Sequence, residues 1–322
     1  MVDLADVEQA YERIRQYVNK TPVMTSRTLN GMVGGEVFLK CENFQRVGAF
    51  KPRGALNAIL SLTDEERKLG IITHSSGNHA QAVALAGKLL NIKTVIVMPE
   101  NAPQVKVNAT KDTYGADIVR CDNNTESRAR TAEELVEKHG YTLVHAYDNS
   151  DIVAGAGTAA YELIKEVGPL DFIFFPIGGG GLASGTVIAS KGLNPDGKIV
   201  GVEPEKADDA FRSIRDNKIY PSPYPDTIAD GLRTQLSELT FSIIKEYGTK
   251  IILVPEIKII DAMKFLWERM KIIVEPSGAV PVAGILQYKE NLKSKRIGAI
   301  LSGGNVDLND FFQKYYDQIS SN

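Results

Sequence analysis

The stretch FIFFPIGGGGLASGTVI, residues 172–188, decides the fold of this chain. Its first six residues are apolar, as in a strand that is buried on both faces, and its end has a helix pattern. Four consecutive glycines, Gly178 to Gly181, join the two parts. A strand, a glycine turn and a helix N-terminus can bind phosphate, because glycine lets an anion approach free backbone N–H groups. The alternative is a tight turn that only packing requires, and four glycines in a row favour the anion site.

Strand-type and helix-type segments alternate along most of the chain. Strands are expected at residues 36–40, 93–98, 141–146, 172–177, 198–202, 250–254 and 296–301. Helices are expected at residues 81–90, 125–139, 155–167 and 262–271, and after a capping box formed by Thr63 and Glu66. This alternation predicts an α/β fold with two open, mostly parallel, twisted sheets flanked by helices, and an active site in the cleft between them. We expect a small, mobile domain at residues 70–147 and a large domain at residues 1–69 and 148–322.

Composition excludes several classes of protein. The net charge of -3 argues against a nucleic-acid binder, and no apolar stretch is long enough to cross a membrane. The acidic, amphipathic N-terminus is neither a secretory signal nor a transit peptide. Two cysteines, Cys41 and Cys121, form no disulfide framework, so a reducing, cytoplasmic setting is expected. The chain lacks both the Walker A motif and the dinucleotide fingerprint, which makes a Rossmann dehydrogenase improbable.

A single lysine, Lys51 in the segment AFKPRGA, is the first candidate for chemistry. Most lysines are solvated surface charges. The apolar neighbours Ala49, Phe50 and Pro52 favour a pocket instead, where desolvation lowers the pKa of an amine and makes it nucleophilic. Such a lysine forms a Schiff base with an aldehyde, and the glycine turn suits a phosphate. Pyridoxal phosphate carries both groups.

Two further polar loops each follow an apolar run. Residues 73–79, THSSGNH, precede a helix and are dense in hydroxyl and amide groups, which suits a carboxylate. Considered alone, this loop is more simply explained as a helix N-cap. The loop LSGGN, residues 301–305, is either a turn or a way of placing the Ser302 hydroxyl against a ligand ring.

The ordered set of motifs resembles the β-family of pyridoxal-phosphate enzymes, of fold type II, typified by the tryptophan synthase β subunit. This family includes serine racemases and serine/threonine dehydratases. The resemblance covers almost the whole chain and rests on the segments AFKPRG, SSGNHAQA, PIGGGGL, VEPE, TIADG, WERMK and LSGGNVD. Each motif alone is weak evidence for the family, whereas the ordered set is specific. The set is most similar to the racemase branch.

The resemblance implies a role for each motif. Lys51 would form the Schiff base with the cofactor and act as the base on one face of the substrate Cα. Asn78 would donate to the 3′-oxygen of the ring, and Gly178, Gly179, Gly180 and Gly181 would hold the phosphate. Ser302 would meet the pyridine nitrogen, where a hydroxyl leaves the ring largely neutral and a weaker electron sink. This arrangement suits racemisation or elimination rather than transamination.

The serine at position 76 distinguishes the branches of the family. Dehydratases usually have alanine there, whereas Ser76 could return a proton to the face opposite Lys51, which racemisation requires. The substrate carboxylate is expected on the loop residues Ser75, Ser76, Asn78 and His79.

Two effector sites follow from the resemblance. Glu203, the Ala207 carbonyl and Asp209 would bind Mg²⁺, Ca²⁺ or Mn²⁺, although an acidic helix start explains the same residues. ATP would act as a nucleotide effector at Gln81, Tyr114, Lys271 and Asn305. The resemblance also implies a homodimer.

Lys51 and Ser76 together predict a racemase that interconverts L- and D-serine and also eliminates water from serine to give pyruvate and ammonia. One alternative is a dedicated dehydratase for threonine, serine or threo-3-hydroxyaspartate. Another is a non-catalytic protein that binds a nucleotide or sugar phosphate in the glycine turn.

Overall fold

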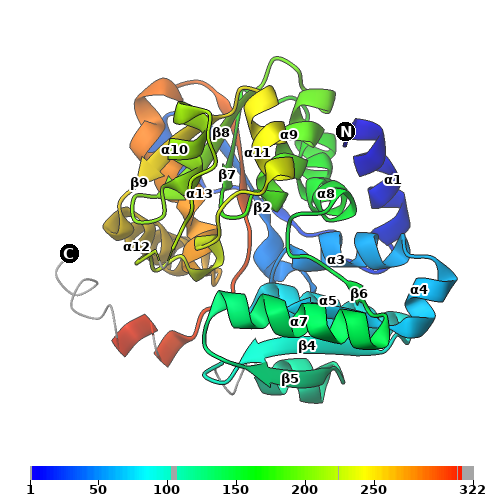
Figure 1. Ribbon diagram of the computed structural model, residues 1–322. Helices are drawn as coiled ribbons and strands as arrows, with labels where there is room; N and C mark the ends of the chain where they lie inside the picture. Colours follow the sequence, from blue (N-terminus) through cyan, green and yellow to red (C-terminus); the bar gives the residue numbers. More distant parts are fainter. Residues whose placement is uncertain (1, 103–106, 224, 310, 314–322) are drawn as a thin grey trace.

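The computed structural model describes residues 2–102, 107–223, 225–309 and 311–313. These residues form two separate β-sheets, each covered by helices on both faces (Figure 1). The larger sheet has six strands in the order β1-β2-β10-β7-β8-β9, and the smaller has four in the order β5-β4-β3-β6. The prediction of two open, mostly parallel sheets is confirmed.

All neighbouring strands of the larger sheet are parallel except the pair β1–β2. Because parallel strands need crossovers, helices cover both faces and the strands are mostly apolar. β10, the last strand among the described residues, lies in the interior of the sheet between β2 and β7. The strands are β1 (Val23–Met24), β2 (Glu36–Cys41), β7 (Phe172–Pro176), β8 (Lys198–Pro204), β9 (Lys250–Val254) and β10 (Arg296–Leu301).

Two hydrophobic cores lie on the two faces of this sheet. On one face α2, α12 and α13 pack around Phe174, Val202 and Val280, and on the other α1, α8, α9 and α11 pack around Phe175 and Val187. The helices that precede β3 or follow β6 in the sequence are α1 (Leu4–Ile14), α2 (Arg27–Val33), α3 (Lys51–Leu60), α4 (Asp64–Leu69), α8 (Ser150–Val167), α9 (Gly181–Leu193), α10 (Asp209–Asp216), α11 (Glu238–Glu246), α12 (Glu256–Phe265) and α13 (Pro276–Tyr288). The short helical turns in the same two segments are η1 (Glu42–Phe44), η2 (Arg46–Gly48), η4 (Asp230–Leu232), η5 (Leu266–Met270) and η6 (Lys289–Asn291).

The smaller sheet is entirely parallel and lies below the larger one in Figure 1. It consists of β3 (Ile71–His74), β4 (Thr94–Pro99), β5 (Asp117–Cys121) and β6 (Thr142–Leu143). α5 (Asn78–Leu90) and the turn η3 (Ala109–Thr113) cover one face, and α7 (Thr125–His139) covers the other. All four strands fall between residues 71 and 143. The domain boundaries predicted from the sequence stay a prediction.

Most expected elements are confirmed, including the capping box in which Thr63 and Glu66 bond to each other at the start of α4. Three expectations were wrong in extent. The helix expected at 155–167 begins earlier, at Ser150. The strand expected at 141–146 is only Thr142–Leu143, and the helix expected at 262–271 begins at Glu256, directly after Pro255, and continues as the π-helix η5. No strand was expected at β5, whose residues are mostly half-buried and include Asp117 and Arg120.

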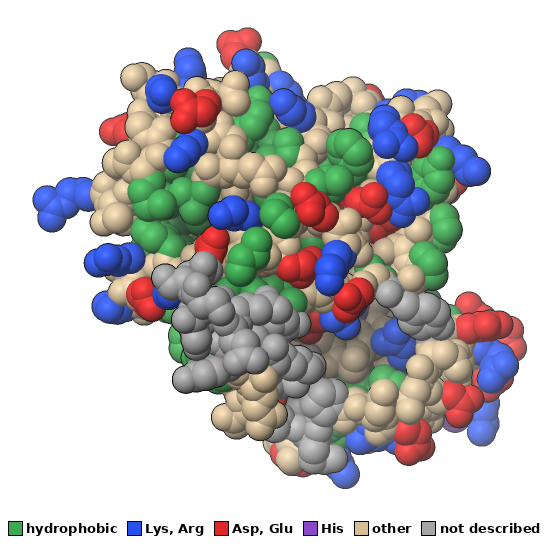
Figure 2. Space-filling view, turned by 90° about the vertical axis from the view of Figure 1, so that its left-hand side faces the viewer, with side chains coloured by type: hydrophobic (Ala, Val, Ile, Leu, Met, Phe, Trp, Pro, Cys, Tyr) green, Lys and Arg blue, Asp and Glu red, His purple; other side chains and the backbone are tan. Residues whose placement is uncertain are grey.

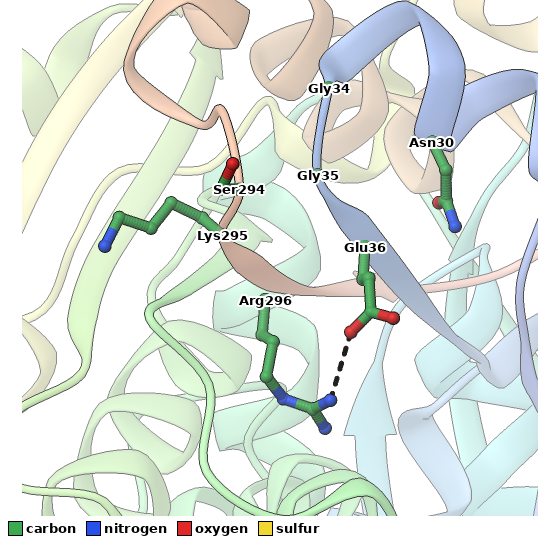
Figure 3. A pocket seen from close by; sticks show the side chains of 7 residues that line it. All are labelled: Asn30, Gly34, Gly35, Glu36, Ser294, Lys295 and Arg296. Carbon is green, nitrogen blue, oxygen red and sulfur yellow. Dashed lines mark hydrogen bonds and ion pairs between the residues drawn. The ribbon is translucent and has the colours of Figure 1, made fainter.

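A shallow pocket lies at the amino ends of β2 and β10, between Gly34, Gly35 and the Ser294 loop (Figure 3). Arg296 and Glu36 form an ion pair across it at 3.1 Å, and Lys295 pairs with Asp171 at 3.2 Å. The charged side chains that line the pocket are therefore paired with oppositely charged groups of the protein. No helix in the described part of the chain is long and apolar enough to span a membrane.

Candidate active site

Three of the predicted motifs meet at the carboxyl ends of the strands of the larger sheet. The glycine turn follows β7, Ser302 follows β10, and Lys51 follows β2 after two short turns. The Phe50 N–H donates to the Ser302 carbonyl at 3.0 Å, and Ala49 forms a β-bridge with Gly303. The lysine loop and the serine loop are thus joined although they lie about 250 residues apart. The side chain of Ser302 makes no hydrogen bond with any described residue, so its hydroxyl is available to a ligand.

Contacts from the smaller sheet complete this region. The Lys51 Nζ donates to the Ala146 carbonyl, just after β6, at 3.0 Å. Asn78, at the start of α5, reaches Glu275 at the start of α13. Parallel sheets place such loops at the carboxyl edges of their strands, where α/β proteins bind ligands. The site therefore lies between the two sheets, where Figure 2 shows that the surface is hollowed.

The environment of Lys51 increases the fraction of its neutral amine. Burial lowers the pKa of the Lys51 ammonium to about 8, although the carboxylate of Glu275 opposes this shift. The ammonium also lies 5.1 Å from the centre of the Phe50 ring. A lysine in this state is a nucleophile and a proton acceptor near neutral pH.

A polar network fixes the amide of Asn78. Its Nδ2 donates to Glu275 Oε1 at 3.0 Å, and its Oδ1 accepts from Asn305 Nδ2 at 2.9 Å. Asn305 donates through the same nitrogen to the Val47 carbonyl, and its N–H donates to Glu275. Nδ2 also donates to Glu275 Oε2 at 3.3 Å, so both ends of the Asn78 amide are fixed, Nδ2 on Glu275 and Oδ1 on Asn305.

The glycine turn forms a cup that has no room for side chains. A Cβ atom added at Gly179 would lie 2.4 Å from the Tyr147 ring, and one at Gly180 would lie 2.7 Å from Thr240. Gly180 also has φ +85°, which strongly favours glycine. The Thr240 hydroxyl holds the turn by donating to the Gly179 carbonyl at 3.0 Å.

The cup can bind an anion. The backbone N–H groups of Gly178 to Gly181 donate to no acceptor among the described residues, and α9 begins at Gly181. Free N–H groups at a helix N-terminus attract a phosphate. The cup, the Lys51 amine and the Asn78 amide fit the phosphate, aldehyde and ring oxygen of pyridoxal phosphate.

The loop after β3 offers backbone N–H groups and one free hydroxyl. The Ser75 N–H donates to the Val97 carbonyl, so it is already occupied, whereas those of Asn78 and His79 belong to the first turn of α5. The His79 ring lies against the Val144 carbonyl at 3.0 Å, and burial lowers its pKa to about 3. The side chain of His79 is therefore a neutral anchor, and only its backbone faces a ligand. The Ser76 hydroxyl makes no hydrogen bond with any described residue.

The predicted metal residues form a buried acidic pair. The Glu203 carboxylate accepts the N–H groups of Ala210 and Phe211 at 3.1 and 2.7 Å. Asp209 is 1% exposed, and neither of its carboxylate oxygens has a hydrogen-bond partner of good geometry among the described residues, although the nearby Ser222 side chain lowers its pKa. Burial raises the pKa of Asp209 to about 6, and burial together with Asp209 raises that of Glu203 well above its usual range.

Two buried carboxylates that lack a counter-charge fit a hard cation that they would share with the Ala207 carbonyl. No group of three or more His, Cys, Asp or Glu side chains suited to a metal occurs in the described part of the chain. The proposed ligand set of two carboxylates and a carbonyl is consistent with that finding.

The four residues predicted for a nucleotide are spread over separate elements. No hydrogen bond or ion pair joins any two of them. Gln81 lies in the first turn of α5, Tyr114 follows η3, and Lys271 follows η5 with φ +61° and donates to Glu268. Asn305 contacts Asn78 in the network described above. The nucleotide site stays a prediction.

The sequence reasoning missed three residues of the site: Glu275, Tyr147 and Thr240. None belongs to a motif, and each contributes through a contact with a distant segment. One weak signal existed for Glu275, which is an acidic residue directly before a proline at a helix start.

Comparison with known proteins agrees with this geometry. Residues 14–303 match the family model described as "Pyridoxal-phosphate dependent enzyme". The chain is 52% identical to an L-threo-3-hydroxyaspartate ammonia-lyase of Saccharomyces cerevisiae, over 94% of this chain and 93% of that protein. It is 49% identical to a serine racemase of Dictyostelium discoideum, over 95% and 96% of the two chains. The structure of maize serine racemase superposes with a TM-score of 0.93 at 43% identity, over 99% and 98% of the two chains. The chain therefore belongs to the family of pyridoxal-phosphate-dependent enzymes.

Proposed function

We propose that this enzyme is a serine racemase that also eliminates water from serine to give pyruvate and ammonia. The observation that carries the proposal is the pair formed by a lysine of low pKa and a serine hydroxyl with no partner among the described residues, Lys51 and Ser76. Racemisation needs a proton carrier on each face of the substrate Cα. Relatives named serine racemases support this reading.

The residues would bind the cofactor at three points. The N–H groups of Gly178–Gly181 would hold the phosphate, Asn78 would donate to the ring 3′-oxygen, and the Ser302 hydroxyl would meet the ring nitrogen. Bound pyridoxal phosphate supplies an aldehyde that condenses with amines and a ring that withdraws electrons from the substrate Cα. Ser302 offers no negative charge, so it would not keep a proton on the ring nitrogen.

The protein residues would then bind substrate and move protons. First-turn N–H groups of α5, at Asn78 and His79, would hold the substrate carboxylate. Neutral Lys51 would accept the Cα proton, and the Ser76 hydroxyl would deliver a proton to the opposite face. Loss of the β-hydroxyl from the same deprotonated substrate would give elimination, so both activities are expected in one site.

A divalent cation would be held by Glu203, Asp209 and the Ala207 carbonyl. The support is that the two carboxylates are buried and form no ion pair with a described residue. The family resemblance is the support for a homodimer and for ATP as an effector. The setting we propose is cytoplasmic, in keeping with two cysteines that are both free and buried.

A dedicated ammonia-lyase for threo-3-hydroxyaspartate is the second candidate, because the Saccharomyces cerevisiae relative has that name. Chiral analysis of the products from L-serine and from L-threo-3-hydroxyaspartate separates the two functions. A racemase forms D-serine from L-serine, whereas a dedicated lyase forms only the keto acid and ammonia.

The role of Ser76 is tested by Ser76→Ala. We expect this variant to lose racemisation at least about 100-fold and to keep elimination, because only racemisation needs the second proton carrier. Ser75→Ala is the matched control, since it removes a neighbouring hydroxyl and should change both products in proportion. If Ser76→Ala retained racemisation, Ser76 would have no role in proton transfer.

A further inference from the structure

Two residues after Lys51, the guanidinium of Arg53 is completely buried between two carboxylates. Its Nε and Nη2 donate to Glu42 at 2.7 and 2.9 Å, and its Nη1 and Nη2 donate to Glu162 at 2.8 Å each. Nη1 also donates to the Thr158 hydroxyl at 3.2 Å. All five N–H groups of Arg53 are therefore used, and its planar fork permits only one orientation.

A second buried cation balances the cluster. Lys40 Nζ, which is completely buried, donates to Glu162 at 2.6 Å and to the Thr21 carbonyl at 2.8 Å. The two positive charges of Lys40 and Arg53 match the two carboxylates. Burial alone would lower the pKa of Arg53, but the two carboxylates raise it, so the guanidinium keeps its charge. We call Lys40, Glu42, Arg53 and Glu162 the Arg53 cluster.

The cluster joins segments that are far apart in the sequence. Lys40 belongs to β2, Glu42 to η1, Arg53 to the first turn of α3, and Glu162 to α8. α3 also packs very closely on α8, because a Cβ at Gly54 would lie 2.9 Å from the Ile152 carbonyl. The first turn of α3 is thereby attached to η1, directly after β2, through Glu42, and to α8 through Glu162.

This attachment matters because the start of α3 has no side-chain cap. The residue before the helix, Phe50, makes no capping hydrogen bond from its side chain. Uncapped first turns have free N–H groups and are the part of a helix that frays. Here the turn begins at Lys51 itself, and the Arg53 N–H donates to the Phe50 carbonyl at 3.0 Å.

We infer that Arg53 is a positioning residue for Lys51: its fixed fork, held by Glu42 and Glu162, sets where the Lys51 amine meets its ligand. The inference rests on the proposed function, in which Lys51 is the reacting amine. The cluster is neutral overall, and the groups that shift the pKa of Lys51 are burial and Glu275, not Arg53. Arg53 therefore acts on the position of Lys51 and not on its charge.

The test compares Arg53→Lys with a variant destabilised elsewhere. Arg53→Lys keeps the charge but loses the fork, so it cannot bond to both carboxylates at once. Leu292→Ala is the matched control, because Leu292 is completely buried just before β10, at the amino ends of the strands, whereas Lys51 lies at their carboxyl ends. Each holoenzyme is analysed for melting temperature, kcat, KM and the pyridoxal phosphate dissociation constant. Borohydride reduction and peptide mapping then report the fraction of Lys51 that is linked to the cofactor.

A displacement of the reacting group by about 1 Å can cost about 100-fold in rate. We expect Arg53→Lys to lower kcat between about 10- and 100-fold, with KM within about threefold, and to reduce the labelled fraction of Lys51. Leu292→Ala should lower the melting temperature while kcat and labelling stay at wild-type values. Thr158→Val removes one hydrogen bond of the fork, the one that Nη1 donates to an uncharged hydroxyl. This variant is expected to fold and should lower kcat in the same direction by a smaller factor.

The inference is overturned if Arg53→Lys and Thr158→Val retain wild-type kcat and labelling while only the melting temperature falls, since the cluster would then be purely structural. Failure of the proposed function looks different: wild-type protein itself would carry no label at Lys51.

Discussion

The low pKa of Lys51 predicts how fast the protein captures pyridoxal phosphate as pH changes. Only a neutral amine attacks the aldehyde, and an ordinary lysine has a pKa of 10.5, whereas that of Lys51 is about 8. At about pH 7.5 the neutral fraction is then roughly one quarter instead of roughly one thousandth, a difference of about 200-fold. The capture rate should rise with pH, reach half of its maximum near pH 8, and level off at higher pH.

The assay mixes cofactor-free protein with pyridoxal phosphate at a series of pH values and follows the visible absorbance of the bound cofactor. N-acetyl-lysine methyl amide is the matched reference amine, and its rate should keep rising to above pH 10. Glu275→Gln provides the second perturbation: the negative charge of Glu275 raises the pKa of Lys51, so its removal should shift the midpoint to lower pH. A protein midpoint that coincides with that of the reference amine, or an upward shift in Glu275→Gln, would refute the reasoning.

Three further variants test other parts of the site. Gly179→Ala places a Cβ 2.4 Å from the Tyr147 ring, so pyridoxal phosphate affinity, measured by absorbance titration, should fall more than about tenfold. Gly31→Ala, where nothing lies within 4 Å, should bind normally, and equal binding by both variants would contradict the cup. Asp209→Asn removes a buried carboxylate whose pKa is raised to about 6, so the metal-free protein should melt at a higher temperature. In wild type, Mg²⁺ should raise the melting temperature at about pH 7.5 and lose this effect below about pH 6, where Asp209 is protonated; a Mg²⁺ effect that persists in Asp209→Asn would disprove the site. Asn305→Ala removes the donor to Asn78, so the dissociation constant of pyridoxal phosphate should rise about fivefold, and an unchanged constant would mean that Asn305 does not orient Asn78.

Local patterns were enough to predict both sheets and the loops that carry chemistry. The glycine turn could be read from residues 172–188 because strand, turn and helix are contiguous, and glycine has few other reasons to occur four times in a row. The strand β5 could not be read in the same way. It contains Asp117 and Arg120 and is only half-buried, so its pattern lacks the apolar run of a central parallel strand.

The parts of the site that were missed depend on contacts between distant segments. Glu275 is 197 residues from Asn78, and Thr240 is 61 residues from Gly179. Such pairings are set by the tertiary fold and leave no spacing that can be read in a sequence. The role of Arg53 was overlooked for the same reason, since Glu162 lies 109 residues away.

The position of β10 has a consequence for how the protein is made. β10 fills the gap between β2 and β7, yet it leaves the ribosome after almost every other strand and helix. Until it inserts, those two neighbours expose unpaired N–H and C=O groups, and such bare edges recruit other chains. Nascent or prematurely terminated polypeptides that lack Arg296–Leu301 also lack Ser302 and the support it gives to the loop before Lys51. They are therefore expected to aggregate and to be unable to retain the vitamin B6 coenzyme. Truncated products would thus contribute no enzyme activity.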